Sequence, residues 1–143
     1  MKRTATAHWQ GNLKEGKGIV STESGGLEEK SYSYKTRFVE GEKGLNPEEL
    51  LAAAHASCFT MQVAANLSDK GFKPKSLDTK ATVTLEGSSI TDVRLSITGD
   101  IKDITADEFS SVTRDAEKNC PISKTLKIPI LSEAHLIPFL VSN

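Results

Sequence analysis

The chain has 143 residues, 37% hydrophobic and 26% charged, which fits one globular domain over residues 1–143 and excludes a disordered, fibrous or collagen-like chain. Eighteen basic residues nearly balance nineteen acidic ones, giving a formal net charge of −1, so the basic excess typical of nucleic-acid binders is absent. Two cysteines are too few for a disulfide scaffold, and no signal-like apolar run follows Lys2 and Arg3, so we expect a cytoplasmic protein.

The first forty residues predict short β-strands. Residues 5–9 form one extended run, and residues 16–20 lead into a second run that breaks at Ser24-Gly25-Gly26. In residues 31–38, Tyr, Thr and Phe alternate with Ser, Lys and Arg, which predicts a third strand. Arg37 then lies on the polar face of that strand, opposite the aromatic side chains.

The strongest helix signal follows a Gly-rich connection at residues 41–46. Asn46 is a good N-cap residue and Pro47 suits the first helical position. The two glutamates that come next complement the positive end of the helix dipole. We expect this helix to run to about Lys70 and to end at Gly71.

Two runs of alternating residues follow the long helix. Residues 76–85 alternate, with Leu77, Thr79, Ala81, Val83 and Leu85 on one face, and residues 90–101 alternate less strictly. A Gly-Ser-Ser turn at residues 87–89 separates them. This pattern predicts a β-hairpin.

The last part of the chain predicts two helices and an extended end. Either Thr105 or Asp107 can cap a helix that runs to about Asn119, and Pro121 can start a short further helix. Residues 126–139 read as extended chain. The element order predicts an α+β fold in which a sheet packs against helices.

The segment 50–68 carries no acidic or basic side chain other than His55, and six of its positions are Ala. Its length allows a membrane span, but polar residues are spread through it, which favours a core helix and no membrane contact. So apolar a helix is hard to cover in a small domain, and its alanines let another backbone approach closely. We therefore expect a homodimer; the alternative is a monomer whose own sheet and second helix cover this helix.

The sequence lacks the usual hydrolase, phosphate-loop, dinucleotide-binding and zinc-protease motifs. His55 and Cys58 lie three positions apart, so they share a helix face. Together with Cys120 and His135 they contain the donor types of a Cys₂His₂ zinc site. Their spacing resembles no known zinc finger, and we expect no metal and no bound cofactor.

Two thiols remain as candidate reactive groups, and both could be inert buried side chains. Cys120 comes directly before Pro121 at a predicted helix start, where free backbone N–H groups would stabilise a thiolate. Cys58 lies in the middle of an apolar helix, where its pKa would be raised unless a cation is near. By these local rules Cys120 is the more reactive cysteine.

A family resemblance runs along nearly the whole chain. It is carried by H-W-x-G at residues 8–11, G-K-G at 16–18, S-T-E-S-G at 21–25, T-R-F at 36–38, G-E-K-G-x-N-P-E-E-L-L-A-A-A-H-A-S-C-F at 41–59 and N-C-P-I-S at 119–123. In these motifs the chain resembles the OsmC branch of the OsmC/Ohr family. The nineteen-residue motif is too long for chance agreement.

The resemblance implies a thiol peroxidase that reduces organic hydroperoxides, with a dithiol or a lipoylated protein as reductant. It implies an intertwined α+β homodimer with antiparallel sheets packed around long central helices. It assigns Cys58 as the cysteine that attacks the peroxide and Cys120 as the resolving cysteine, which converts a sulfenic acid to a disulfide. Arg37 matches the arginine that activates the first thiol, and Glu48 matches the acid that holds this arginine.

The spacing of these residues agrees with a dimeric site. Glu48 and Cys58 are ten positions apart, roughly 15 Å along one helix, so they do not easily meet within one chain. Two such helices crossing antiparallel at a two-fold axis could bring them together. Two alternatives stay open: a redox-sensing or small-molecule-binding protein of the same fold without turnover, and a structural dimer with inert thiols.

Overall fold

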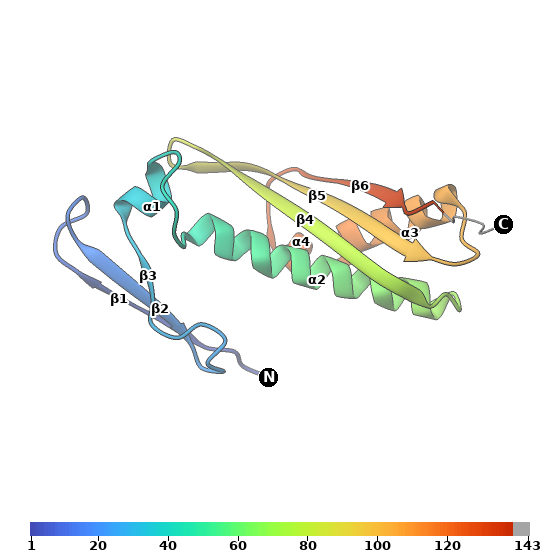
Figure 1. Cartoon of the computed structure of the whole chain (residues 1–143), viewed down its shortest axis with the longest axis horizontal. Helices are drawn as coiled ribbons and strands as arrows, with labels where there is room; N and C mark the ends of the chain where they lie inside the picture. Colours follow the sequence, from blue (N-terminus) through green and yellow to red (C-terminus); the bar gives the residue numbers. More distant parts are fainter. Residues whose placement is uncertain (139–143) are drawn as a thin grey trace. The chain divides into compact units, whose positions relative to one another are not determined.

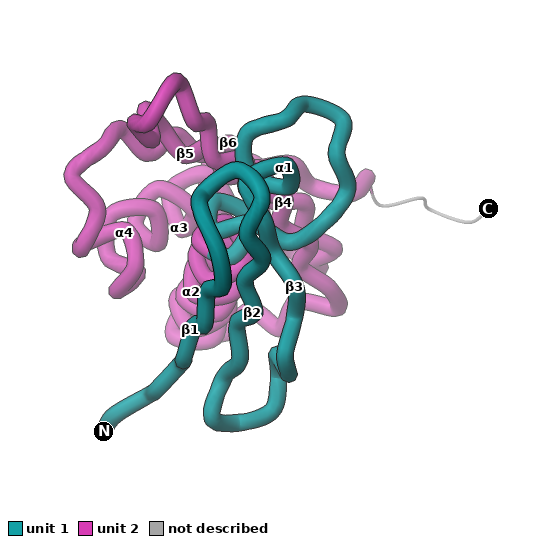
Figure 2. The backbone as a smooth tube through the Cα atoms, turned by 90° about the vertical axis from the view of Figure 1, so that its left-hand side faces the viewer, with its two compact units in different colours: residues 1–50 teal, residues 51–143 magenta. Residues whose placement is uncertain are grey.

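The computed structural model of the chain describes residues 1–138 and divides into two compact units, residues 1–50 and the chain from residue 51 onward (Figure 2). Figure 1 shows the elements in chain order: β1 (Ala5–Gln10), β2 (Lys17–Thr22), β3 (Lys30–Tyr32), α1 (Tyr34–Phe38), α2 (Pro47–Asp69), β4 (Pro74–Glu86), β5 (Ser89–Ile101), α3 (Ala106–Asn119), α4 (Pro121–Thr125) and β6 (Ile130–Leu136). The mixture of sheets and helices confirms the predicted α+β class.

The first unit contains an antiparallel sheet in the order β1-β2-β3. The first two strands confirm the extended runs predicted near the N-terminus. Gly18 on β2 pairs with Tyr32 on β3, and its missing side chain leaves room for two rings. A Cβ at this position would lie 2.6 Å from the ring of Tyr32 and 2.7 Å from that of Trp9, so only glycine fits between them.

The prediction of one strand over residues 31–38 is wrong, because β3 ends early and a helical turn, α1, follows. Ser33 caps this turn: its hydroxyl accepts a hydrogen bond from the Thr36 backbone N–H at 3.3 Å. The Thr36 hydroxyl accepts one in return from the Ser33 backbone N–H at 2.9 Å. This reciprocal cap outweighs the alternating pattern. Arg37 consequently lies on a helix rather than on a strand.

The long helix α2 begins and ends close to the predicted residues. The Glu49 backbone N–H donates to the Asn46 side-chain oxygen at 2.8 Å, as expected of an N-cap. At the other end Gly71 has a φ of +83°, in the left-handed region that favours glycine. The backbone N–H of Phe72 donates back to the Leu67 carbonyl at 2.9 Å and closes the helix end.

The second unit contains the sheet β4-β5-β6. Strands β4 and β5 form the predicted hairpin, whereas β6 runs parallel to β5 and departs from the expected antiparallel pairing. Thr105 caps α3 with Glu108 in a capping box. Strand β6 lies within the predicted extended run 126–139, whose last residue is outside the described part of the chain. The core of the unit comes from α2, β5 and α3: Phe59, Val63, Leu67, Val93, Leu95, Ile97, Ile101, Phe109, Val112 and Ala116.

Helix α2 is only partly a core helix. Phe59, Val63 and Leu67 are fully buried, but Met61 on the same helix is 74% exposed. By length and composition α2 could cross a membrane, a criterion that core helices of soluble proteins also meet. In the 18-residue stretch of α2 that meets this criterion, 22% of the residues are buried. The expected homodimer stays a prediction.

Candidate active site

The two cysteines, distant in sequence, are in contact in the second unit. Cys58 lies on α2 and is half-buried, and Cys120 lies at the junction of α3 and α4 and is fully buried. Both are free thiols, Cys58 packs against the buried cluster that includes Cys120, and the Cys120 thiol lies close enough to raise the pKa of Cys58. The structure therefore brings together the two residues that the resemblance assigns to attack and resolution.

The first turn of α4 lies beside both sulfur atoms. Cys120 is the N-cap of this turn, and its sulfur accepts a hydrogen bond from the Ser123 N–H at 3.4 Å. The backbone of Ile122, in the same turn, lies near the Cys58 thiol and lowers its pKa. Pro121 occupies the first helical position, where a missing N–H has no cost. The predicted helix start after Cys120 is confirmed.

The pKa of Cys58 lies above its ordinary value. Burial raises it most, the neighbouring Cys120 thiol raises it further, and the Ile122 hydrogen bond acts in the opposite direction. Burial raises a thiol pKa because it disfavours the charged thiolate. The shift has the direction predicted for a thiol in an apolar helix without a cation.

A buried histidine and a buried serine extend the thiol pair. The Nε2 atom of His55 lies 2.8 Å from the hydroxyl oxygen of Ser123, and this oxygen lies 3.2 Å from the sulfur of Cys120. His55 is 0% exposed and Ser123 is 6% exposed. Burial lowers the pKa of His55, which favours the neutral ring.

Sequence reasoning placed His55 on the face of Cys58 but did not single out Ser123. A signal for the serine was available. Ser123 follows Cys120 by three positions at a predicted helix start, and an N-cap side chain meets the residue at that spacing.

In the first unit, Arg37 and Glu48 form an ion pair. The Arg37 Nη2 donates to Glu48 Oε1 at 2.9 Å, and its Nε donates to Oε1 at 3.1 Å and to Oε2 at 3.4 Å. The Glu48 side chain is 9% exposed and that of Arg37 is 41% exposed. The side-chain amide of Asn46, just before α2, donates to the Thr36 carbonyl at 3.3 Å and ties α1 to the helix that carries Glu48.

A pocket of about 300 Å³ lies beside Arg37 in the same unit. Most of its lining is aromatic or aliphatic: Trp9, Leu13, Tyr32, Ser33, Tyr34, Arg37 and Phe38. The guanidinium carbon of Arg37 lies 5.0 Å from the centre of the Phe38 ring, within cation–π range. The pocket thus combines apolar walls with one cation.

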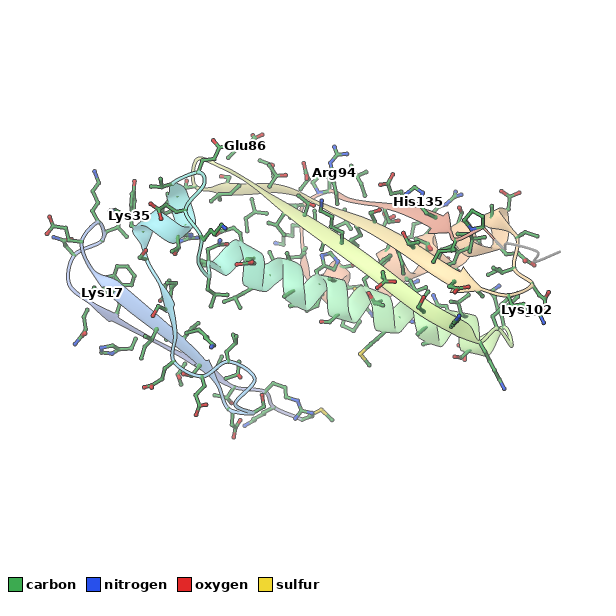
Figure 3. The ribbon with its side chains drawn as sticks, in the orientation of Figure 1. Lys17, Lys35, Glu86, Arg94, Lys102 and His135 are labelled. Atoms are coloured by element: carbon green, nitrogen blue, oxygen red, sulfur yellow. The ribbon has the colours of Figure 1, made fainter. Side chains whose placement is uncertain are left out.

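The zinc arrangement considered from the sequence has no geometric support. Within residues 1–138, no three His, Cys, Asp or Glu side chains gather in a way that could hold a metal ion. His135 lies on β6 (Figure 3), is largely exposed, and has its Nε2 atom 3.6 Å from a Glu133 oxygen.

Comparison with known proteins gives consistent matches. Residues 40–133 match the family described as OsmC-like protein. The chain is 46% identical over 134 residues to a protein named peroxiredoxin OsmC from Escherichia coli strain K12, covering 91% of this chain and 93% of that protein. An OsmC-like protein of unknown function from Vibrio cholerae has the same fold, with a TM-score of 0.74 at 16% identity over 94% of this chain and 99% of that one. The organic hydroperoxide resistance protein OhrB of Bacillus subtilis matches with a TM-score of 0.63 at 21% identity, over 94% and 98% of the two chains.

Proposed function

The chain belongs to the OsmC family, and we propose that it is a thiol-dependent peroxidase that reduces organic hydroperoxides to alcohols. The observation that carries the proposal is the close approach of the Cys58 and Cys120 thiols. Two free thiols in contact can take up the two oxidising equivalents of a peroxide as a disulfide. The name of the E. coli relative, peroxiredoxin, supports a peroxidase in general.

In the first step the Cys58 thiolate attacks the terminal oxygen of the hydroperoxide. The O–O bond breaks, a sulfenic acid forms on Cys58, and the alkoxide leaves with a proton as the alcohol. Cys58 is assigned this step because it is half-buried, whereas Cys120 is completely buried and thus less accessible to a substrate.

In the second step Cys120 attacks the oxidised Cys58 sulfur, and water leaves as the disulfide forms. An external dithiol then reduces this disulfide by thiol exchange and closes the cycle. Lipoyl groups, free or on a protein, are the dithiols that the family resemblance implies.

Arg37 supplies the cation that the first step needs. A thiol whose pKa is raised by burial becomes a good nucleophile only when an opposite charge stabilises the thiolate. Arg37 is permanently charged, and its paired contacts to Glu48 fix the guanidinium in direction. We propose that these two residues act on Cys58 within a homodimer. The apolar α2, only partly buried within one chain, supports an assembly of two copies.

The apolar pocket beside Arg37 supports an organic rather than an inorganic peroxide. Hydrogen peroxide gains nothing from aromatic walls, whereas an alkyl or aryl chain does. We expect kcat/KM to be higher for bulky hydroperoxides than for hydrogen peroxide.

A dithiol-coupled peroxidase assay tests the proposal. The wild-type protein, Cys58→Ser and Cys120→Ser are each given an organic hydroperoxide and, in parallel, hydrogen peroxide. We expect Cys58→Ser to consume no peroxide and Cys120→Ser to consume one equivalent with little turnover. If Cys58→Ser keeps the initial oxidation and Cys120→Ser loses it, the roles of the two thiols are reversed.

The same pair of free thiols also fits a second candidate, a redox sensor that oxidises once and signals. Such a protein would form the disulfide without turning over excess hydroperoxide. Sustained consumption with a dithiol present excludes it.

A further inference from the structure

We infer that Ser123 and His55 hold Cys120 ready as a nucleophile: Ser123 donates its hydroxyl proton to the cysteine sulfur, and His55 fixes the direction of that hydroxyl. The inference rests on the proposed function, in which Cys120 attacks the oxidised Cys58. It concerns the three-residue array His55–Ser123–Cys120, which lies entirely within the second unit.

The direction of the hydrogen bonds follows from the histidine. A neutral imidazole carries one N–H, and the two ring nitrogens of His55 have different surroundings. Nε2 lies 2.8 Å from the Ser123 hydroxyl oxygen, whereas Nδ1 is buried with no hydrogen-bond partner within residues 1–138. Burying an N–H without an acceptor is rarer in proteins than burying an unused lone pair. The proton of His55 therefore sits on Nε2 and is donated to Ser123.

Because the Ser123 oxygen accepts this bond from His55, the Ser123 hydroxyl can donate its own proton to a different acceptor. The Cys120 sulfur, at 3.2 Å, is the other partner of this oxygen. The same sulfur accepts the Ser123 backbone N–H at 3.4 Å. Two donors from one residue thus converge on the sulfur, and hydrogen bonds of this direction stabilise the thiolate over the thiol.

The stabilised thiolate is what the disulfide-forming step consumes. The Cys120 thiolate attacks the sulfur of the Cys58 sulfenic acid, the S–S bond forms, and the S–O bond breaks. Hydroxide leaves and takes the proton given up by the Cys120 thiol, so water is the product. The Cys58 sulfur is reduced and the Cys120 sulfur is oxidised, with no other reactant needed. Ser123 acts directly on the reacting sulfur, and His55 is a positioning residue.

The histidine proton can be located in the wild-type protein. Long-range ¹H–¹⁵N NMR spectra distinguish the two neutral tautomers of a histidine by the shifts of its ring nitrogens. We expect His55 to carry its proton on Nε2 at neutral pH. A proton on Nδ1 would overturn the inference, because Nε2 would then accept the Ser123 hydroxyl and leave Cys120 without that donor.

The effect on the thiol can be measured without peroxide. The chain has only two cysteines, so in a Cys58→Ala background the ultraviolet thiolate absorbance reports Cys120 alone, with a variant lacking both cysteines as blank. At a fixed pH where the thiolate is the minor form, we expect Ser123→Ala to lower the thiolate fraction about tenfold, the effect of losing one hydrogen bond to a charged group. Thr113→Val is the matched control, since it also removes a buried hydroxyl, but one that has no hydrogen-bond partner in the described part of the chain.

Two substitutions separate positioning by His55 from simple packing. His55→Gln keeps a side-chain N–H for Ser123 and should retain most of the thiolate, whereas His55→Leu should lose it as Ser123→Ala does. An unchanged thiolate fraction in Ser123→Ala, or equal loss in His55→Gln and His55→Leu, would overturn the inference.

A single-turnover experiment connects the array to catalysis. After one equivalent of organic hydroperoxide, we expect disulfide formation in Ser123→Ala to be about threefold slower for each tenfold loss of thiolate, since a less stabilised thiolate is intrinsically more nucleophilic. The Cys58 sulfenic acid should consequently live longer and be trapped by a dione reagent. Wild-type disulfide formation in this variant would contradict the inference. Absence of peroxide consumption by the wild-type protein would instead refute the proposed function, while the thiolate measurement would still decide on the array.

Discussion

Arg37→Ala removes the cation that is held against Glu48, and we expect it to lower both stability and activity. The substitution leaves a carboxylate that is 9% exposed without its partner. Breaking a fully buried pair costs about 3–5 kcal/mol and an exposed pair about 0–1 kcal/mol. Because Arg37 itself is 41% exposed, we expect a loss of about 2 kcal/mol in the free energy of unfolding. For a chain of this length that lowers Tm by about 4–8 °C.

The expected effect on activity is larger. In the proposed dimeric site the Cys58 thiolate would lose its counter-charge, and a rise of one unit in the pKa of Cys58 would remove about 90% of the thiolate at neutral pH. The leaving alkoxide also loses a stabilising charge, so the peroxidase rate should fall by about two orders of magnitude. Raising the pH should recover the part due to the thiolate but not the part due to the leaving group.

Two conservative variants test the geometry of the pair. Arg37→Lys keeps the charge but has only one nitrogen for the carboxylate, so it should recover only part of the rate. Glu48→Gln keeps the shape and should let the guanidinium move, lowering the rate less than Arg37→Ala. Stopped-flow peroxide consumption and the pH dependence of Cys58 alkylation are the measurements. If Arg37→Ala keeps wild-type turnover and wild-type alkylation of Cys58, Arg37 is a surface charge whose ion pair with Glu48 has only a structural role.

Three further expectations concern stability and assembly. Burial lowers the pKa of His55 from 6.5, so as the pH falls the unfolded chain binds a proton before the folded chain does. The free energy of unfolding should therefore fall below pH 6.5, by up to about 1.4 kcal/mol per pH unit. Chemical denaturation at pH 5–7 should show a weaker pH dependence of stability in His55→Gln. Thr105→Ala should destabilise the protein by about 1 kcal/mol in the same assay, because the α3 cap loses the hydroxyl that accepts the Glu108 N–H. Light scattering at micromolar concentration should give the mass of two chains, and a folded, active monomer would contradict the dimeric site.

Capping residues and alternating residue patterns predicted much of the fold. The limits of α2 follow from Asn46 and Gly71, whose cap and left-handed conformation both occur in the structure. The hairpin β4–β5 follows from alternation around a short turn. These elements were predictable because each depends on residues close together in sequence.

Three features were not predictable in this way. The stretch 31–38 contains an alternating pattern and a Ser-x-x-Thr cap at once, and only the folded chain shows that the cap prevails over the strand after Tyr32. The parallel pairing of β6 with β5 depends on where α3 and α4 return the chain, which residue patterns do not encode. The place of Ser123 between His55 and Cys120 likewise requires the packing of α2 against α4.

Which of the two thiols attacks the peroxide depends on a nearby positive charge rather than on a position at a helix start. Cys120 receives two hydrogen-bond donors from Ser123, in keeping with the sequence argument that it is the more reactive thiol, while the pKa of Cys58 is raised. Cys120 is nevertheless fully buried, which suits an attack on a neighbouring sulfur better than on an incoming peroxide. Cys58 can be the first nucleophile only if a cation reverses the effect of burial, and Arg37, fixed by its ion pair, is the candidate. The rate of Cys58 alkylation at neutral pH in the wild-type protein, compared with Arg37→Ala, therefore decides whether Arg37 activates Cys58 as the first nucleophile.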